Sequence, residues 1–273
     1  PTSHPVHAQF TVWTQIALSP DGTKIAVAGR AYRSGDEVLH PVDILDATTG
    51  ELLMSMEDSS GDEIQLLAWH PDNTHLASSD LLTKIVIWDT ADSSRLEFYS
   101  RLPVIDELKW SPTNSTLATT CGGRIVLWDI DTNANTIGRL PNLTRLRISP
   151  PTGIGDIAWN SDGSRLALTG RGYVKIHDTT TTEWPLITEF AVTEVNERYE
   201  INSIDWGPQD ELIALSGRGG TFILNTDTWE IEATHPEGMF YIDWSPDGTR
   251  LAGTVNGEAQ IWTVEPWQLE IEY

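Results

Sequence analysis

Three arginines recur at one position of an internal repeat, and their type and spacing point most clearly to chemistry. Arg30, Arg171 and Arg218 each follow a glycine, and each comes eight residues after a repeated turn. A guanidinium group presents a planar pair of donors that matches a carboxylate or phosphate in two-point geometry. Tyr32 and Tyr173 lie two residues beyond the first two arginines and add contact area. We expect these five residues to bind an acidic group of a partner. The alternative is that each arginine pairs with a carboxylate of the adjoining repeat.

No sequence signature of an enzyme is present. The chain has no GxSxG nucleophile elbow, no HExxH zinc motif, no GxxxxGK[ST] phosphate loop and no GxGxxG that opens a helix. Cys121 is the only cysteine, and the sequence places no histidine to act with it. Adjacent carboxylates such as those of Asp62 and Glu63 are too common in so acidic a chain to indicate acid–base catalysis. We therefore expect a protein without enzyme activity.

Two segments carry residue types found in metal sites. His4 and His7 lie in a proline-flanked terminus, where a solvated tail is the simpler interpretation. The alternating carboxylates and amides of residues 129–135 resemble the start of a calcium loop. Ala134 and Leu140 stand where such a loop needs glycine and glutamate, which favours an exposed polar turn. The sequence therefore predicts neither a metal site nor a cofactor.

The charge of the chain restricts its partners. Its 273 residues include 40 Asp and Glu against 17 Lys and Arg, which gives a formal net charge of −23. Such a field repels nucleic acid and anionic membranes, so we expect neither nucleic-acid binding nor membrane insertion. No apolar run approaches the roughly 18 residues of a membrane helix. The composition favours a cytoplasmic protein, with a secreted or extracellular one as the alternative, and it leaves the oligomeric state open.

One repeated turn organises the elements that must position the arginines. It follows a short strand that ends in a bulky apolar residue, and its Pro, Asp, Asn and Gly residues suit a tight corner. Its six copies are Leu18–Gly22, Trp69–Asn73, Trp110–Asn114, Trp159–Gly163, Trp206–Asp210 and Trp244–Gly248. Equivalent positions are 51, 41, 49, 47 and 38 residues apart. These intervals centre on the roughly 40–45 residues of a four-stranded blade.

The intervals predict an all-β chain, a six-bladed β-propeller of four-stranded antiparallel blades in one domain over residues 1–273. The expected blades cover approximately residues 10–56, 57–100, 101–140, 150–190, 197–234 and 236–273. Insertions are expected at residues 31–40, 140–152 and 194–200.

Two further structural expectations concern the core and the chain ends. We interpret the tryptophans that open five of the turns as core residues, namely Trp69, Trp110, Trp159, Trp206 and Trp244. We expect residues 268–273 to form the outer strand of the sixth blade. Residues 3–8 would then lie against that strand or stay loose.

The repeats resemble those of the WD40 family. The likeness rests on Trp88-Asp89, Trp128-Asp129 and the repeated turns, and it covers residues 10–273. The Gly-His pair of the family is nearly absent, with Thr234-His235 as its one near copy. TolB-like propellers share such turns and are the alternative relatives.

The resemblance implies a platform that binds a protein or an acidic peptide on a loop face around a central channel. In this family the loops between second and third strands, where the arginines lie, form the face that recruits ligands. A TolB-like or hydrolase-associated propeller with a small-molecule site at the channel mouth is one alternative. A sensor module of a larger multidomain protein is another.

Overall fold

A computed structural model describes most of the chain, and all regular structure in the described residues is β-strand. The described residues are 13–29, 32–34, 37–58, 62–100, 104–121, 124–130, 142–144, 155–170, 172–181, 183–191, 201–264 and 268–272. The chain divides into two compact units, residues 1–121 with 126–144 and residues 122–125 with 145–273. Among the described residues, no helix is long and apolar enough to cross a lipid bilayer.

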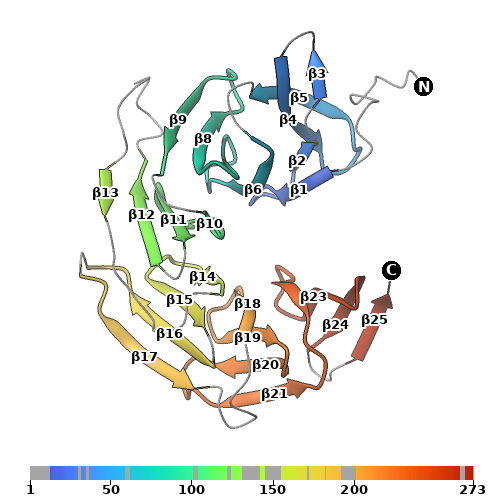
Figure 1. Ribbon diagram of the computed structural model, residues 1–273. Coiled ribbons are helices and arrows are strands. Elements are labelled where there is room, and N and C mark those ends of the chain that lie inside the picture. The colour runs from blue at the N-terminus through green and yellow to red at the C-terminus, as the bar shows by residue number, and fades with distance from the viewer. Residues whose placement is uncertain are drawn as a thin grey trace. The chain divides into compact units, whose positions relative to one another are not determined.

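Three antiparallel sheets occupy the first half of the chain (Figure 1). The first contains β1 (Trp13–Leu18), β2 (Lys24–Gly29), β3 (Tyr32–Ser34), β4 (Glu37–Asp46) and β5 (Leu52–Asp58). The second contains β6 (Ile64–Trp69), β7 (His75–Asp80), β8 (Lys84–Asp89) and β9 (Arg95–Tyr99). The third contains β10 (Glu107–Trp110), β11 (Thr116–Cys121), β12 (Arg124–Asp129) and β13 (Asn142–Thr144).

Three further sheets follow the same plan in the second half. The fourth contains β14 (Ile157–Trp159), β15 (Arg165–Gly170), β16 (Tyr173–Asp178) and β17 (Leu186–Ala191). The fifth contains β18 (Ile201–Trp206), β19 (Leu212–Gly217), β20 (Gly220–Asn225) and β21 (Ile231–His235). The sixth contains β22 (Phe240–Trp244), β23 (Arg250–Val255), β24 (Glu258–Thr263) and β25 (Gln268–Glu272). The predicted all-β chain of six antiparallel sheets is confirmed.

The strand count follows the prediction in five sheets and departs from it in the first. That sheet has a fifth strand, β3, which pairs with the start of the long β4. The extra hairpin uses residues predicted to be an insertion. In the third sheet the outer strand is β13, which starts two residues after the predicted blade end at residue 140. Of the other predicted insertions, residues 194–200 lie outside the described part of the chain.

The last sheet takes its outer strand from the C-terminal end of the chain, as predicted. β25 pairs with β24 in antiparallel register, with Ile271 opposite Ile261 and Leu269 opposite Trp262. Residues 3–8, the other candidate for this place, lie outside the described residues.

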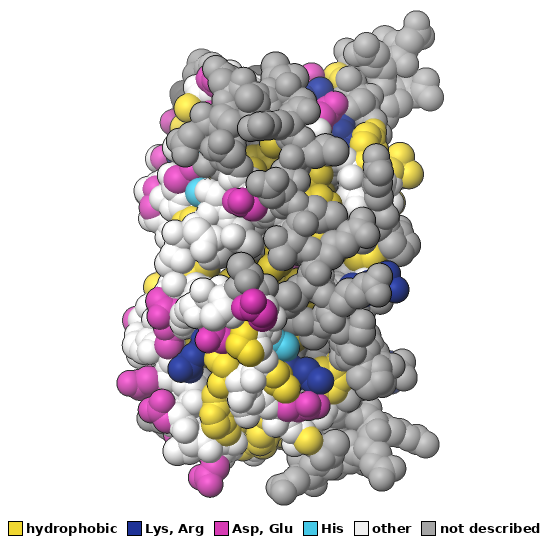
Figure 2. All heavy atoms as spheres, turned by 90° about the vertical axis from the view of Figure 1, so that its left-hand side faces the viewer, with side chains coloured by type: hydrophobic (Ala, Val, Ile, Leu, Met, Phe, Trp, Pro, Cys, Tyr) yellow, Lys and Arg dark blue, Asp and Glu magenta, His cyan; other side chains and the backbone are white. Residues whose placement is uncertain are grey.

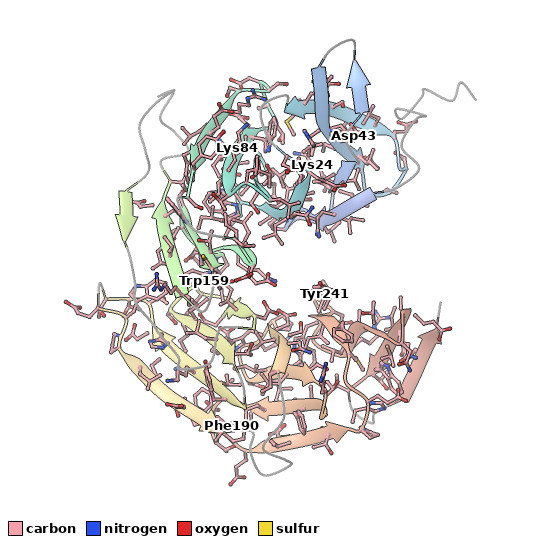
Figure 3. All side chains as sticks on the ribbon, in the orientation of Figure 1. Lys24, Asp43, Lys84, Trp159, Phe190 and Tyr241 are labelled. Atoms are coloured by element: carbon pink, nitrogen blue, oxygen red, sulfur yellow. The ribbon has the colours of Figure 1, made fainter. Side chains whose placement is uncertain are left out.

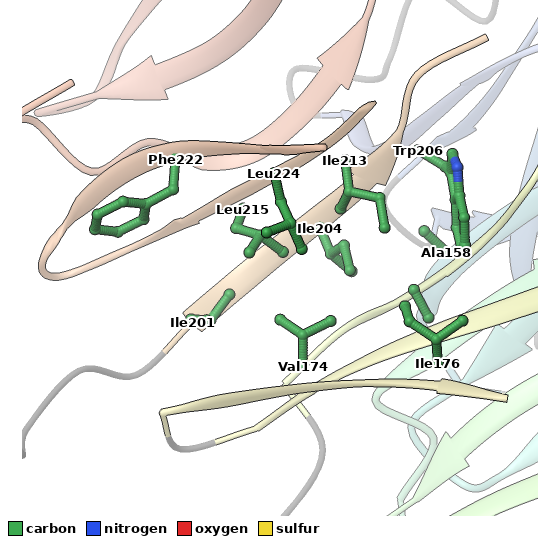
Figure 4. Close-up of a cluster of buried hydrophobic side chains, with 11 residues drawn as sticks. Ala158, Val174, Ile176, Ile201, Ile204, Trp206, Ile213, Leu215, Phe222 and Leu224 are labelled. Atoms are coloured by element: carbon green, nitrogen blue, oxygen red, sulfur yellow. The ribbon is translucent and has the colours of Figure 1, made fainter. Parts of the chain in front are cut away.

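Apolar side chains from neighbouring sheets interlock to form the core. In one cluster, Val174 and Ile176 of the fourth sheet pack against Ile204 and Leu215 of the fifth (Figure 4). The second strands place small, fully buried alanines in the middle of their sheets, where neighbouring sheets approach closely. Those alanines are Ala26, Ala77, Ala118, Ala167 and Ala214.

The turn tryptophans belong to this core to different degrees. Trp69, Trp110 and Trp206 are buried, as predicted. Trp159 and Trp244 are only half-buried. The indole N–H groups of Trp69 and Trp110 donate to carbonyl oxygens of the preceding sheet. These tryptophans therefore tie neighbouring sheets together as well as filling space.

Candidate functional site

The structure describes one of the three predicted arginines fully. Arg218 lies in the short turn between β19 and β20 and is exposed. No carboxylate of the described residues pairs with its guanidinium group. Arg30, Arg171 and the side chain of Tyr32 lie outside the described part of the chain, so their convergence stays a prediction.

The Tyr173 side chain packs against the loop between β15 and β16. Its side chain is only 8% exposed at the start of β16. The ring lies so close to Gly170 that a Cβ atom there would collide with it. The Nζ atom of Lys175 is 5.3 Å from the ring centroid, within the range of a cation–π contact. A ring covered in this way offers a partner little of the contact area that the sequence suggested.

In the second sheet, the position equivalent to the arginines is held by an exposed leucine. Leu81 and Leu82 are 51% and 60% exposed in the loop between β7 and β8. Tyr99, at the adjacent end of β9, is 55% exposed. The two segments touch, because the Ser100 N–H donates to the Thr83 carbonyl over 2.9 Å. We call Leu81, Leu82 and Tyr99 the apolar loop patch.

Buried polar groups hold the apolar loop patch in place. The Asp80 carboxylate accepts hydrogen bonds from the Lys84 N–H at 2.8 Å and the Asp62 N–H at 3.1 Å. The Lys84 side chain is fully buried, and its ammonium group lies 3.1 Å from the Glu97 carboxylate (Figure 3). A buried charge needs such partners, so this loop is a rigid base for its exposed leucines.

The repeated turns lie at the other ends of the same second strands and are hydrogen-bonded to one another. Three turns have glycine at the fifth position, with φ close to +70°. Asn73 and Asp210 take the same left-handed conformation, with φ of 61° and 64°. The Asn73 side-chain oxygen accepts the Asp21 N–H of the preceding turn at 2.9 Å. The Asp210 carboxylate accepts both the N–H and the hydroxyl of Ser161 at 2.7 Å. In the second and fifth turns the side chain that replaces glycine therefore links two sheets, whereas Asn114 of the third turn accepts the Thr116 N–H of its own turn.

A shallow polar hollow of about 230 Å³ lies beside the link between the fourth and fifth sheets. Its lining includes Arg165 and the carboxylates of Asp162, Asp210 and Glu211. Two of these carboxylates already accept hydrogen bonds from the turns. The hollow is thus part of the structural link between turns.

The second turn brings together three side chains that the sequence analysis did not consider. His70 Nδ1 lies 3.0 Å and His75 Nδ1 lies 2.6 Å from the same Asp72 carboxylate oxygen, Oδ2. Burial alone would raise the pKa of Asp72, but hydrogen bonds from Thr74 and His75 outweigh it and hold that pKa well below its usual value. Burial also lowers the pKa of His70, despite the nearby carboxylate. At neutral pH the turn therefore pairs an ionised carboxylate with a neutral His70 imidazole.

A signal for this cluster was present in the sequence. The second turn alone has histidine at both its second and seventh positions, counted from the apolar residue that opens it. The repeated turn was defined by its first five positions, so the second histidine fell outside it. Of the metal candidates weighed in the sequence, His4 and His7 lie outside the described residues, as does the segment of residues 129–135 apart from residues 129 and 130. Cys121 is buried.

Comparison with known proteins places these sheets in a family. The family model described as WD domain, G-beta repeat matches residues 50–89 and 103–129, which cover the end of the first sheet, the second sheet as far as β8, and most of the third. These two stretches match WD40 repeats, and they support the resemblance of the chain to a divergent WD40 propeller. The TolB-like alternative is not needed to explain its repeats.

The chain is also similar to proteins that are longer than it. Actin-interacting protein 1 of Drosophila melanogaster is 22% identical over 77% of this chain and 35% of its own length. Protein HIR1 of Cryptococcus neoformans is 24% identical over 77% of this chain and 28% of its own length. The WD repeat-containing protein WDS homolog of Arabidopsis thaliana is 24% identical over 95% of this chain and 47% of its own length. This WD40 chain thus spans less than half the length of these relatives.

A solved structure supports the same fold. The β-propeller domain of Cps50 (Swd1) from Myceliophteria thermophila has a TM-score of 0.74, covering 96% of this chain and 86% of that domain at 17% identity. The two best Trp-Asp pairs of this WD40 propeller have equivalent surroundings. The indole N–H of Trp88 donates to the Ser78 hydroxyl at 2.9 Å, and that of Trp128 donates to the Thr119 hydroxyl at 3.0 Å. These buried contacts join the third strand of a sheet to its second.

Proposed function

We propose that this WD40 propeller is a non-enzymatic platform that binds a protein or peptide on the face carrying the loops between second and third strands. The observation that carries the proposal is the apolar loop patch, whose three large side chains are more than half exposed on a rigid loop. Apolar side chains gathered in this way gain free energy when a partner covers them. The relatives support a binding role because they are WD-repeat proteins, one of them named for its interaction with actin.

The arginines at the equivalent repeat position would add charge recognition. Arg218 is exposed and has no ion-pair partner within the described chain. Arg30 and Arg171 share its repeat position, and Tyr32 follows Arg30 as Tyr173 follows Arg171. On the face shown in Figure 2, acidic side chains are scattered over the described surface. A few arginines in such a field would select a partner segment that offers a carboxylate beside apolar residues.

Substitution of the patch tests this function. The double variant Leu81→Asp, Leu82→Asp should lose the proteins that wild type captures from a lysate of its source cells, because buried carboxylates oppose apolar contact. Leu53→Asp is the matched control, since Leu53 is 53% exposed on the outer strand β5 of the first sheet. Arg218→Glu should weaken capture of the same proteins. Thermal unfolding checks that each variant is folded. Equal capture by wild type and the double variant would contradict the proposal.

A further inference from the structure

We propose that the second repeat turn is a binding site for a divalent metal ion of the zinc class, held by Nδ1 of His70, Oδ2 of Asp72 and Nδ1 of His75. One ligand atom from each of these three residues lies within 4.8 Å of the other two. Imidazole nitrogens and a carboxylate oxygen are typical ligands of zinc, and three protein ligands leave a fourth position for water. The site lies at the opposite end of β7 from the apolar loop patch and is independent of the proposed function.

The outer nitrogens of both imidazole rings face oxygen atoms. His70 Nε2 lies 3.2 Å from the Ser115 hydroxyl, and its ring packs edge-on against Trp110 with centroids 4.7 Å apart. His75 Nε2 lies 3.7 Å from the Asp89 carboxylate. Histidines that bind metal are usually oriented by polar groups near the outer nitrogen, which can hold the proton when the inner nitrogen binds the ion. Both rings are therefore arranged to present Nδ1 to the turn.

The contacts of His70 Nδ1 favour a cation beside it. This nitrogen accepts the Asp72 N–H at 3.2 Å, so its lone pair points into the turn. The same nitrogen lies 3.0 Å from Oδ2 of Asp72. A nitrogen and a carboxylate oxygen this close can bind one metal ion together.

The fold of the turn does not require these histidines. At the position of His70, other turns have Ser19, Ser111, Asn160, Gly207 and Ser245. At the position of His75 they have Lys24, Thr116, Arg165, Leu212 and Arg250. In the first and sixth turns the serine hydroxyl donates a hydrogen bond to the turn aspartate at 2.6 Å. This bond stabilises the turn without an imidazole ring. The chain itself thus supplies substitutions that preserve the turn.

Metal binding requires only a small movement. With metal–ligand bonds of about 2.1 Å, tetrahedral ligand atoms lie about 3.4 Å apart. The two present distances to Asp72 Oδ2, 3.0 and 2.6 Å, must therefore each lengthen by less than about 1 Å. The Asp72 side chain is 34% exposed, so it can make this movement and the ion can reach it from solvent. The proton on His75 Nδ1 can pass to Nε2, which faces Asp89.

Calorimetric titration of the metal-stripped full chain with ZnCl2 tests the proposal. Wild type should bind one Zn2+ ion with an affinity that His70→Ser and His75→Arg each weaken by at least about tenfold. Asp72→Asn should weaken it similarly, because the amide keeps the backbone contacts of the turn but loses the charge. Asp247→Asn is the matched control, since it changes the same position in the sixth turn, which has no histidine. Its Zn2+ affinity should equal that of wild type.

Cobalt provides an independent measurement. Co2+ bound by wild type should give visible absorption bands that disappear in His75→Arg and persist in a His4→Ala, His7→Ala variant. Thermal unfolding in EDTA shows whether each variant is folded. If His70→Ser does not fold, the metal affinity of His75→Arg alone tests the site. Wild-type Zn2+ affinity in folded His75→Arg, or equal weakening by Asp247→Asn, would overturn the proposal.

Discussion

Single residues at the fifth position of the second and fifth repeated turns link neighbouring sheets. Asp210 accepts a left-handed backbone that glycine adopts without strain in three other turns. The strain of this backbone conformation is offset by two hydrogen bonds of 2.7 Å that Ser161 donates to the Asp210 carboxylate. The sequence shows Asp, Asn and Gly here only as turn formers. Their second role depends on which groups of the preceding turn come within reach.

We expect Asp210→Gly to lower the free energy of unfolding by about 1–3 kcal/mol, because the Ser161 N–H loses its charged acceptor. Asp210→Ala should cost roughly 1 kcal/mol more, since alanine keeps the left-handed strain. Urea denaturation measures both changes. Gly22→Ala is the control for strain alone, because open space surrounds its added Cβ. If Asp210→Gly is as stable as wild type, the link between sheets contributes nothing.

The turn aspartates also make stability depend on pH. The Ser245 hydroxyl, and then the Thr249 hydroxyl and N–H, donate to Asp247 and lower its pKa to about 2. A pKa lowered by folding stabilises the protein above the unfolded value of 3.8, and this contribution disappears as the pH falls toward 2. The difference in unfolding midpoint between wild type and Asp247→Asn should therefore be largest at pH 5 and shrink toward pH 2.

Thermal unfolding at pH 5, 4, 3 and 2 follows that difference. Asp227→Asn is the control, because this exposed carboxylate accepts no hydrogen bond from the described residues. A gap between wild type and Asp247→Asn that stays constant down to pH 2 would show that the hydrogen bonds do not act through the ionised carboxylate.

At the scale of elements, the repeated turns and their spacing predicted most strands. The second and third strands lie close to where their apolar residues and flanking turns place them, because a buried strand needs both. β3 and β13 were not predicted, since three-residue strands have too few residues to show a period. The apolar loop patch was missed for another reason. The exposure of Leu81 depends on the loop conformation that the hydrogen bonds of Asp80 stabilise. No pattern in the neighbouring sequence predicts this conformation.

Among the elements, β25 is the best test of how the last sheet is completed. Deleting residues 268–273 should lower the free energy of unfolding by several kcal/mol, because it exposes the edge and one side of β24. Deleting residues 1–8 should have a much smaller effect. Urea denaturation compares the two truncated chains with the full one. A larger loss from the N-terminal deletion would mean that the N-terminal segment holds the last sheet.

At the scale of the whole molecule, the repeat arithmetic predicted the fold better than any motif predicted the function. Six turns in one register leave no residues for a seventh sheet, and the described part of the chain contains six sheets. The proposed binding surface consists of a few loop side chains, and the proposed metal site consists of three atoms in one turn. The WD40 repeats fix the positions of these residues but do not determine their types. The sequence therefore indicates at which position of the repeat a binding residue can lie. It does not indicate which copies of the repeat have a binding residue there.

The net charge of −23 destabilises the folded chain through general repulsion, and the stability of the protein should therefore depend on salt concentration. Like charges repel in the compact state, and raising the ionic strength shortens the screening length from about 30 Å at 0.01 M to about 4 Å at 0.5 M. Most described ion pairs, such as Lys175 with Glu189 at 3.4 Å, are partly exposed and contribute little that salt could remove. The midpoint of thermal unfolding at pH 7 should therefore rise by several degrees between 0.01 and 0.5 M NaCl. Near pH 4.4, the isoelectric point of the sequence, the same salt should have little effect. A midpoint that falls with salt at pH 7 would mean that specific ion pairs outweigh the general repulsion.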